Sequence, residues 1–284
     1  MYYGIVIISV LMFGIQFYLN DKYQKESGSD IGSSLLFSFI SSLAGVICLA
    51  AINGFDFSFT PFTIVWAAVS AITFILYTVC TLKALQRINL SVYSLFSMLG
   101  GMILPFLAGI IFYNESLTVA KVLCLLSVSG ALLITVSPGK RTGGEIYYLG
   151  VFVLNGLYGV LSKVYEESAF NKTSAGGYSL WVSIISALIT GIGLIALCKD
   201  LKLTSIRSVL YSAGGGALNR IANLLLLISL AFLPASVQYP FVTGGVIIVS
   251  TLIAALTKQK PSKREIFAVC LSFAGLLALV LIPI

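Results

Sequence analysis

The chain has 284 residues, of which 58% are hydrophobic and 10% are charged, and its mean hydropathy is +1.04. A soluble domain carries about a quarter charged residues, so this composition excludes an ordinary soluble globular protein. The net charge is +7, but the basic residues stand in short groups beside apolar runs, without the interleaved aromatics of a nucleic-acid surface, so we expect no nucleic-acid partner.

Apolar runs of about 20 residues, enough for a helix to cross a ~30 Å hydrocarbon layer, follow one another along the chain. They predict an all-α integral membrane protein whose ten transmembrane helices lie in a lipid bilayer. The expected spans are 2–20, 31–52, 61–82, 91–113, 118–137, 146–165, 175–197, 206–232, 235–257 and 265–283. The first run lacks the basic start and the cleavage pattern of a signal peptide, so we expect it to be retained.

Basic residues are divided unevenly between the two sides of this arrangement. Apart from Arg220 inside the eighth run, only three basic residues lie on the side to which the even-numbered runs lead: Lys121 at the start of the fifth run, Lys163 at the end of the sixth and Lys172 after it. Lys163 stands close to acidic residues, and we expect it to be solvated or locally paired. All other lysines and arginines fall after odd-numbered runs. Because cytoplasmic segments carry the excess of positive charge, we expect both termini to face outward from a plasma or inner membrane.

The sequence matches itself when it is shifted by 145 residues, so that Tyr2 falls on Tyr147 and Gly130 on Gly275. Single matches between apolar helices carry little information, but this register holds without a gap through five helices. It predicts an internal duplication with three parts. These are an N-terminal five-helix repeat of residues 1–139, a linker of residues 140–145 and a C-terminal five-helix repeat of residues 146–284. Because each repeat has an odd number of helices, the second runs inverted through the membrane, as is typical of transporters with a midplane site.

Short motifs keep the same order in both halves. In the first half the run 82–95 is followed by Pro105 and Glu115, and in the second half the run 230–239 is followed by a glycine pair. This order resembles that of the drug/metabolite transporter superfamily, in particular its EamA-like ten-helix members, over the whole chain. The resemblance implies alternating access and a central cavity lined by the first, fourth, sixth and ninth helices.

Two features depart from that family. The position that corresponds to Glu115 in the second half is Lys260, so an acidic residue follows the fourth helix but not the ninth. The small multidrug resistance relatives resemble one another in a membrane-embedded glutamate on the first helix, whereas no Asp or Glu falls at mid-membrane depth here and the chain has no histidine. Proton coupling through a buried carboxylate is therefore not expected.

Arg220 stands midway between Arg207 and Pro234, which mark the two ends of the eighth span. An arginine at the centre of a membrane helix costs about 2.5–3.5 kcal/mol, so its side chain must face protein or water. Asn219 and Asn223 share its side of the helix, whereas the leucines mostly occupy the remainder. We hypothesise that Arg220 binds a carboxylate or phosphate with both asparagines as hydrogen-bonding neighbours. The alternative is a structural arginine that caps helix carbonyls or plugs a cavity.

Further candidates for substrate binding lie on the helices that the resemblance assigns to the cavity. They are Gln16, Tyr93, Asn155, Tyr158, Gln238 and Tyr239. Tyr93 and Gln238 hold equivalent positions in the two repeats, so we expect them to face each other.

Proline and glycine pairs mark candidate hinges in the fourth and ninth helices. Pro105 and Pro240 each remove one intrahelical hydrogen bond, and Gly100 and Gly245 lie nearby. Close helix packing accounts for the glycines nearly as well as bending does. Gly130 and Gly275, in the last helix of each repeat, are expected to join the two halves, with a homodimer as the alternative.

These patterns predict a transporter of a small polar metabolite, with an amino acid or an organic anion as the favoured substrate. A flippase for a lipid-linked sugar or phosphate-bearing lipid, a multidrug exporter and a non-transporting scaffold remain alternatives. We expect no enzyme, because convergent nucleophiles, acids and bases are missing. No cofactor or metal is expected either, because the five cysteines lack metal-binding spacing.

Overall fold

The computed structural model describes residues 2–28, 30–85, 90–135, 145–197, 205–257 and 262–281, which form ten α-helices and no strand. Their bounds are α1 Tyr2–Ser27, α2 Ile31–Ile52, α3 Pro61–Leu85, α4 Leu90–Tyr113, α5 Val119–Thr135, α6 Glu145–Glu167, α7 Ala175–Leu197, α8 Ile206–Leu230, α9 Ala235–Leu256 and α10 Lys263–Leu281. The all-helical class predicted from the sequence is confirmed.

Within the described ranges, nine of these helices are long and apolar enough to cross a membrane. The tenth, α5, contributes the shorter apolar segment Val119–Ile134. The helices therefore have the lengths and composition of a multi-pass membrane protein.

The first helix is longer than its apolar run. It continues past residue 20 to Ser27, where Lys25 pairs with Asp21 one turn earlier at 2.6 Å. Such a pair supports a helix at its exposed end, which apolar length alone does not reveal. The helix α2 then begins at the cap Asp30, whose carboxylate accepts a hydrogen bond from the Ser33 amide at 3.1 Å.

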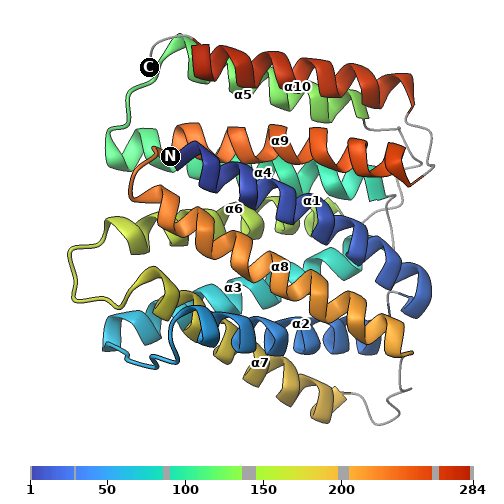
Figure 1. Cartoon of the computed structure of the whole chain (residues 1–284), viewed down its shortest axis with the longest axis vertical. Coiled ribbons are helices and arrows are strands. Elements are labelled where there is room, and N and C mark those ends of the chain that lie inside the picture. The colour runs from blue at the N-terminus through green and yellow to red at the C-terminus, as the bar shows by residue number, and fades with distance from the viewer. Residues whose placement is uncertain are drawn as a thin grey trace.

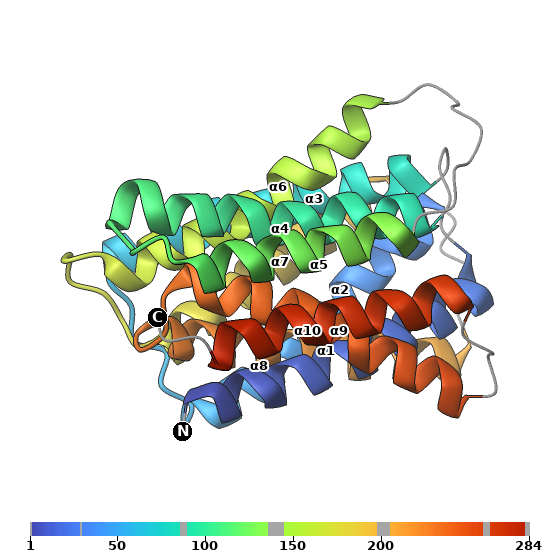
Figure 2. The ribbon, with the colours of Figure 1, turned by 90° about the horizontal axis from the view of Figure 1, so that it is seen from above.

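The helices form two layers, which Figure 2 shows from above. One layer contains α1, α8, α9 and α10, and the other contains α3, α4, α5 and α6. Figure 1 shows α5 and α10 at one edge of the bundle and α2 and α7 at the opposite edge. Each of these two pairs is in contact.

Helix contacts recur when the helix number is shifted by five. The helix α1 packs on α8 and α9, and α6 packs on α3 and α4. Likewise, α2 packs on α8 and α7 packs on α3. The first helix of each half therefore lies among helices of the other half, so the two halves of the sequence are interleaved.

The glycines proposed as hinges lie where helices approach closely. A Cβ atom at Gly100 would lie 2.1 Å from the carbonyl oxygen of Phe152 on α6, and one at Gly245 would lie 2.9 Å from Val10 on α1. Close packing therefore accounts for both glycines. Pro105 and Pro240 are buried within continuous helices, and hinge motion at these sites stays a prediction.

The last helices of the two halves pack against each other. A Cβ atom at Gly275 on α10 would lie 2.8 Å from the Ser127 side chain on α5, and Gly130 faces Leu271. Met102, Val128, Val237 and Leu279 form a buried cluster with these helices. Contact between the halves through α5 and α10 is thus confirmed.

Candidate functional site

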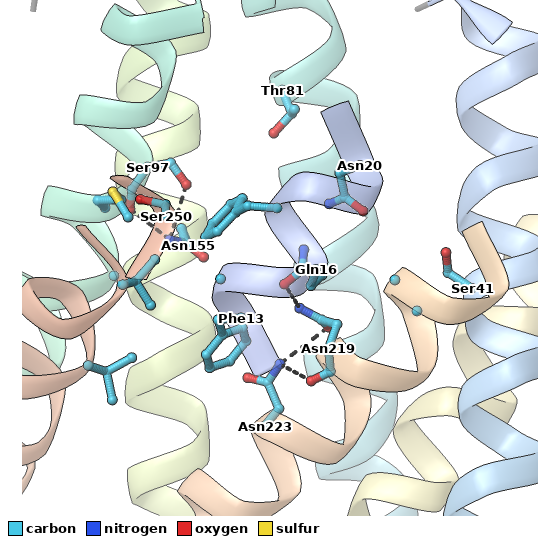
Figure 3. A pocket seen from close by; sticks show the side chains of 18 of the residues that line it. Phe13, Gln16, Asn20, Ser41, Thr81, Ser97, Asn155, Asn219, Asn223 and Ser250 are labelled. Carbon is cyan, nitrogen blue, oxygen red and sulfur yellow. Dashed lines mark hydrogen bonds between the residues drawn. The ribbon is translucent and has the colours of Figure 1, made fainter. Parts of the chain in front are cut away.

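A cavity of about 710 Å³ lies between the layers and reaches one end of the bundle. Gln24 and Gly28 line it where α1 ends, Thr81 lines it near the end of α3, and Glu265 lines it in the first turn of α10. From there it continues inward to Arg220, halfway along α8. Polar side chains line it along its length, and Figure 3 shows part of this lining from close by.

Arg220 is almost fully buried, with 5% of its surface exposed, yet it lines this cavity. Its Nη2 donates a long hydrogen bond of 3.4 Å to Ser42 Oγ on α2, and its Cζ lies 4.9 Å from the centre of the Phe74 ring on α3. Its stem packs on Gly45, where a Cβ atom would lie 2.6 Å from Arg220 Cγ. Contacts with α2 and α3 therefore hold this side chain in place.

The guanidinium of Arg220 has no carboxylate partner in the described part of the chain. The ion pairs found there are Lys25–Asp21, Lys163–Glu115 and Lys163–Glu167. A cation–π contact with Phe74 stabilises the charge by about 0.5–2 kcal/mol but does not neutralise it. An anion in the cavity would supply the missing countercharge and the bidentate geometry that a guanidinium favours.

Three amides extend the polar surface beside Arg220. Asn219 Nδ2 donates to Gln16 Oε1 on α1 at 3.2 Å, and Asn223 Nδ2 donates to the Asn219 carbonyl oxygen at 2.8 Å. Figure 3 shows this row of Gln16, Asn219 and Asn223 at the α1–α8 contact. All three line the cavity, so this part of the predicted site is brought together.

The facing wall is formed mainly by α4, α6 and α9. Asn155 Nδ2 donates to the Ser97 carbonyl oxygen at 2.7 Å, and the Tyr158 ring lies 5.9 Å from that of Phe74. Tyr239 Oη donates to the carbonyl oxygen of Gly159 at 3.0 Å. Asn155, Tyr158 and Tyr239 all line the cavity, as the sequence predicted.

Gln238 does not join this group. Its side chain is fully buried between α8 and α9, where it accepts a hydrogen bond from Ser229 Oγ at 2.6 Å and donates to the Leu226 carbonyl oxygen at 3.0 Å. Gln238 precedes the cavity-lining Tyr239 by one residue, about 100° round the helix, which turns it towards α8. The side chain of Tyr93, its repeat equivalent, lies outside the described residues.

Sequence reasoning missed the polar wall formed by α2. Ser34, Ser38, Ser41 and Ser42 all line the cavity. Their spacing places them on one side of a helix, and this serine stripe in an otherwise apolar span was the available signal.

The opposite end of the bundle is closed by a carboxylate. Glu115, between α4 and α5, accepts hydrogen bonds from the backbone amides of Ala235 at 2.8 Å and Ser236 at 2.9 Å, and from the Ser236 hydroxyl. These are the free amides at the start of α9, where a negative charge is favoured. Burial raises the pKa of Glu115, but the hydrogen bonds from Ser236, Ala235 and Lys163 outweigh this and hold the pKa below its ordinary value.

Lys163 completes this closure. Its Nζ lies 3.1 Å from Glu115 Oε1 and 2.8 Å from Glu167 Oε1, and the residue is only 3% exposed. The expected local pairing is confirmed by Glu167, but the expectation of a solvated lysine is wrong. Glu115 draws the ammonium inward, a contact between distant residues that helix position alone does not reveal.

A second hydrogen-bonded cluster lies at the same end. Tyr165 Oη donates to the Thr173 carbonyl oxygen at 2.9 Å and lies 3.2 Å from Thr63 Oγ1. Tyr178 Oη lies 2.6 Å from Ser70 Oγ, and its ring stacks on that of Tyr165 at 4.0 Å. These residues tie α3, α6 and α7 together beyond the inner end of the cavity.

Comparison with known proteins supports the fold. No protein-family model matches the chain, and no curated protein matches it. Among solved structures, 29 chains match, including one described as "Crystal structure of protein". That chain is 15% identical, with a TM-score of 0.79, and the match covers 98% of the present chain and 95% of that chain. At this identity the likeness establishes a shared fold and carries no function.

Proposed function

We propose that the protein is a membrane transporter for a small metabolite that carries a carboxylate or a comparable anionic group. The observation that carries this proposal is Arg220, a buried guanidinium that lines the cavity and forms no ion pair with the described residues. A purely structural arginine in a membrane protein would be expected to pair with a carboxylate or with helix carbonyls. Arg220 instead directs its charge to a space large enough for a metabolite.

We further infer that the ten helices are two inverted five-helix repeats and that the chain is a relative of the EamA-like drug/metabolite transporters. The recurrence of helix contacts after a shift of five supports the repeat, because pseudo-symmetry requires equivalent pairs. The shared order of motifs supports the kinship.

The cavity is proposed to face the cytoplasm of a cell whose plasma or inner membrane holds the protein. It reaches the end of the bundle where Lys25 ends α1, Lys83 ends α3 and Arg207 begins α8. An excess of basic residues marks the cytoplasmic side. The helix α1 begins, and α10 ends, on the other side, so both termini would lie outside.

We propose alternating access, which is supported by the presence of one open end and one closed end in the state described. In this state, two sets of hydrogen bonds hold the closed end. Glu115 accepts from the first amides of α9, and Tyr239 donates to the Gly159 carbonyl oxygen. Both contacts join one helix layer to the other. We propose that they break, while the opposite end closes round the substrate, when the cavity turns outward.

The test uses purified full-length protein and a panel of carboxylates, with binding measured by thermal stabilisation, which rises with ligand occupancy. Arg220→Gln should weaken binding of any stabilising carboxylate by about ten- to a hundredfold, since a hydrogen bond to a charged group contributes about 1.5–3 kcal/mol. Arg220→Lys should retain part of the effect, because it keeps the charge without the planar fork.

Arg207→Gln is the matched control, because Arg207 is exposed at the start of the same helix and does not line the cavity. It should leave binding and reconstituted uptake unchanged. Equal binding by wild type and Arg220→Gln, or the lack of any stabilising carboxylate, would contradict the proposed function.

A further inference from the structure

The orientation of the Asn155 side-chain amide is set by a backbone group. Its Nδ2 lies 2.7 Å from the Ser97 carbonyl oxygen, which can only accept a hydrogen bond. The NH₂ group must therefore face Ser97, and the carbonyl oxygen Oδ1 must face away from it. No described residue donates a hydrogen bond to this Oδ1, although Asn155 lines the cavity.

Asn223 is oriented in the same way on a different helix. Its Nδ2 donates to the Asn219 backbone carbonyl at 2.8 Å and to Asn219 Oδ1 at 3.3 Å. Its own Oδ1 accepts no hydrogen bond from the part of the chain that the structure describes. Figure 3 shows Asn155 and Asn223 reaching the cavity from separate helices, so α6 and α8 each present one uncommitted carbonyl oxygen.

The charged groups of the cavity wall are few and separated. Among the described lining residues, Arg220 is the basic side chain, and Asp21 and Glu265 are the acidic ones. Asp21 lies near the end of α1 and Glu265 in the first turn of α10, both towards the open end. The inner part therefore combines one fixed positive charge with neutral oxygen acceptors.

This combination selects a particular ligand charge pattern. A ligand with only a positive charge is repelled by Arg220, and a second anionic group meets acceptor oxygens that repel it. A carboxylate and an ammonium on one molecule satisfy both parts, because an ammonium has three donors and no acceptor. Neutral amide oxygens bind it without forming a salt bridge to Arg220 that would neutralise the anion site.

We propose that the cavity has two subsites, with Arg220 for the carboxylate and the Oδ1 atoms of Asn155 and Asn223 for a protonated amine of the same molecule. The substrate is thus a zwitterion of the amino acid type rather than a simple organic anion. This assignment rests on the proposed function, since it presupposes that Arg220 binds the carboxylate.

The experiment compares three probes that share a side chain: leucine, its desamino acid and its decarboxylated amine. Matching sets built on alanine and phenylalanine cover smaller and larger side chains. Thermal stabilisation of the full-length protein gives an apparent Kd for each probe. In at least one set, the amino acid should bind about tenfold or more tightly than its desamino acid, since a charged hydrogen bond contributes about 1.5–3 kcal/mol. The amine alone should not bind.

Side-chain variants locate the second subsite. Asn155→Leu and Asn223→Leu keep the approximate volume and remove the acceptor, so each should reduce the preference for the amino acid over the desamino acid. Asn223→Gln keeps a neutral amide oxygen as the acceptor and should retain part of that preference. Gln238→Met removes a buried amide outside the cavity lining and is the matched control, with the preference unchanged.

The two proposals fail in different ways. Equal, Arg220-dependent binding of the amino acid and its desamino acid overturns the ammonium subsite and leaves the proposed function intact. A preference that survives in the Asn155→Leu, Asn223→Leu double variant also overturns this subsite. Binding that does not depend on Arg220, or no binding by any probe, overturns both proposals.

Discussion

Lys163 and Glu115 form a buried ion pair of 3.1 Å, although they belong to different halves of the chain. The same carboxylate accepts hydrogen bonds from the first amides of α9, so one side chain connects α6, the α4–α5 connection and α9. This contact lies at the end of the bundle opposite the cavity opening. It is the clearest candidate for the contact that the proposed alternating access would break.

Removing the charge of Glu115 should loosen the closed end. Glu115→Gln keeps the shape but weakens both the pair with Lys163 and the charge-assisted bonds from the α9 amides. Ser162 lines the cavity. The reporter is the substitution Ser162→Cys in a chain whose own cysteines have been replaced. An impermeant thiol reagent added outside should label it several-fold faster when Glu115→Gln is present. The control is Glu166→Gln, at the end of α6 near Lys163. Equal labelling of the reporter alone, of the reporter with Glu115→Gln and of the reporter with Glu166→Gln would refute the role of Glu115 as a closing contact.

Acid should weaken the same contact. The pKa of Glu115 is held below its ordinary value in the folded protein, so the carboxylate contributes stability above its unfolded pKa of about 4.3. That contribution disappears as the pH falls through the lower, folded pKa. Glu115→Gln should therefore unfold at a lower temperature than the wild type at neutral pH, and this difference should shrink on acidification, because only the wild type loses the contribution of the carboxylate. Identical acid profiles for the two proteins would exclude a stabilising charge at Glu115.

The inverted-repeat proposal predicts an effect of Lys260, which lies outside the described residues. Lys260 stands 145 residues after Glu115, and an ammonium cannot accept hydrogen bonds from helix-start amides. Under the proposed repeat, Lys260 therefore cannot supply to the start of α4 what Glu115 supplies to the start of α9. Lys260→Glu should supply it and favour the outward-facing state, which increases outside labelling of the Ser162 reporter. Lys260→Gln, which removes the charge without adding a carboxylate, should have a smaller effect.

Two glycines in α8, Gly214 and Gly216, should differ in their tolerance of a methyl group. At Gly216 a Cβ atom would lie 2.3 Å from the Ser41 backbone on α2, whereas at Gly214 the nearest atom is a Leu19 side-chain carbon at 3.4 Å. Gly216→Ala should lower stability by about 1–3 kcal/mol and displace Arg220 from Ser42, weakening carboxylate binding. Gly214→Ala should be neutral or stabilising by up to about 1 kcal/mol, because alanine favours helix. Thermal unfolding compares the two, and equal effects would show that the α8–α2 approach tolerates a side chain.

The helices themselves were predictable from the sequence to within a few residues at most ends. The exception was the end of α1, where the pair Asp21–Lys25 prolongs the helix beyond its apolar run. The central position of Arg220 in its span was predictable as well. The helix positions and the central place of Arg220 both depend on local composition, which can be read directly from the sequence.

Composition along the chain, by itself, determined that this is an all-helical protein built of membrane-length segments, because hydropathy and segment length are local properties. Only the tertiary structure decided which polar groups meet. Gln238 faces α8 rather than the cavity, Ser42 joins Arg220, and Glu115 reaches Lys163. These outcomes depend on the rotation of each helix about its axis and on contacts between residues far apart in sequence. Helix rotation and such contacts are set by the packing of all ten helices together.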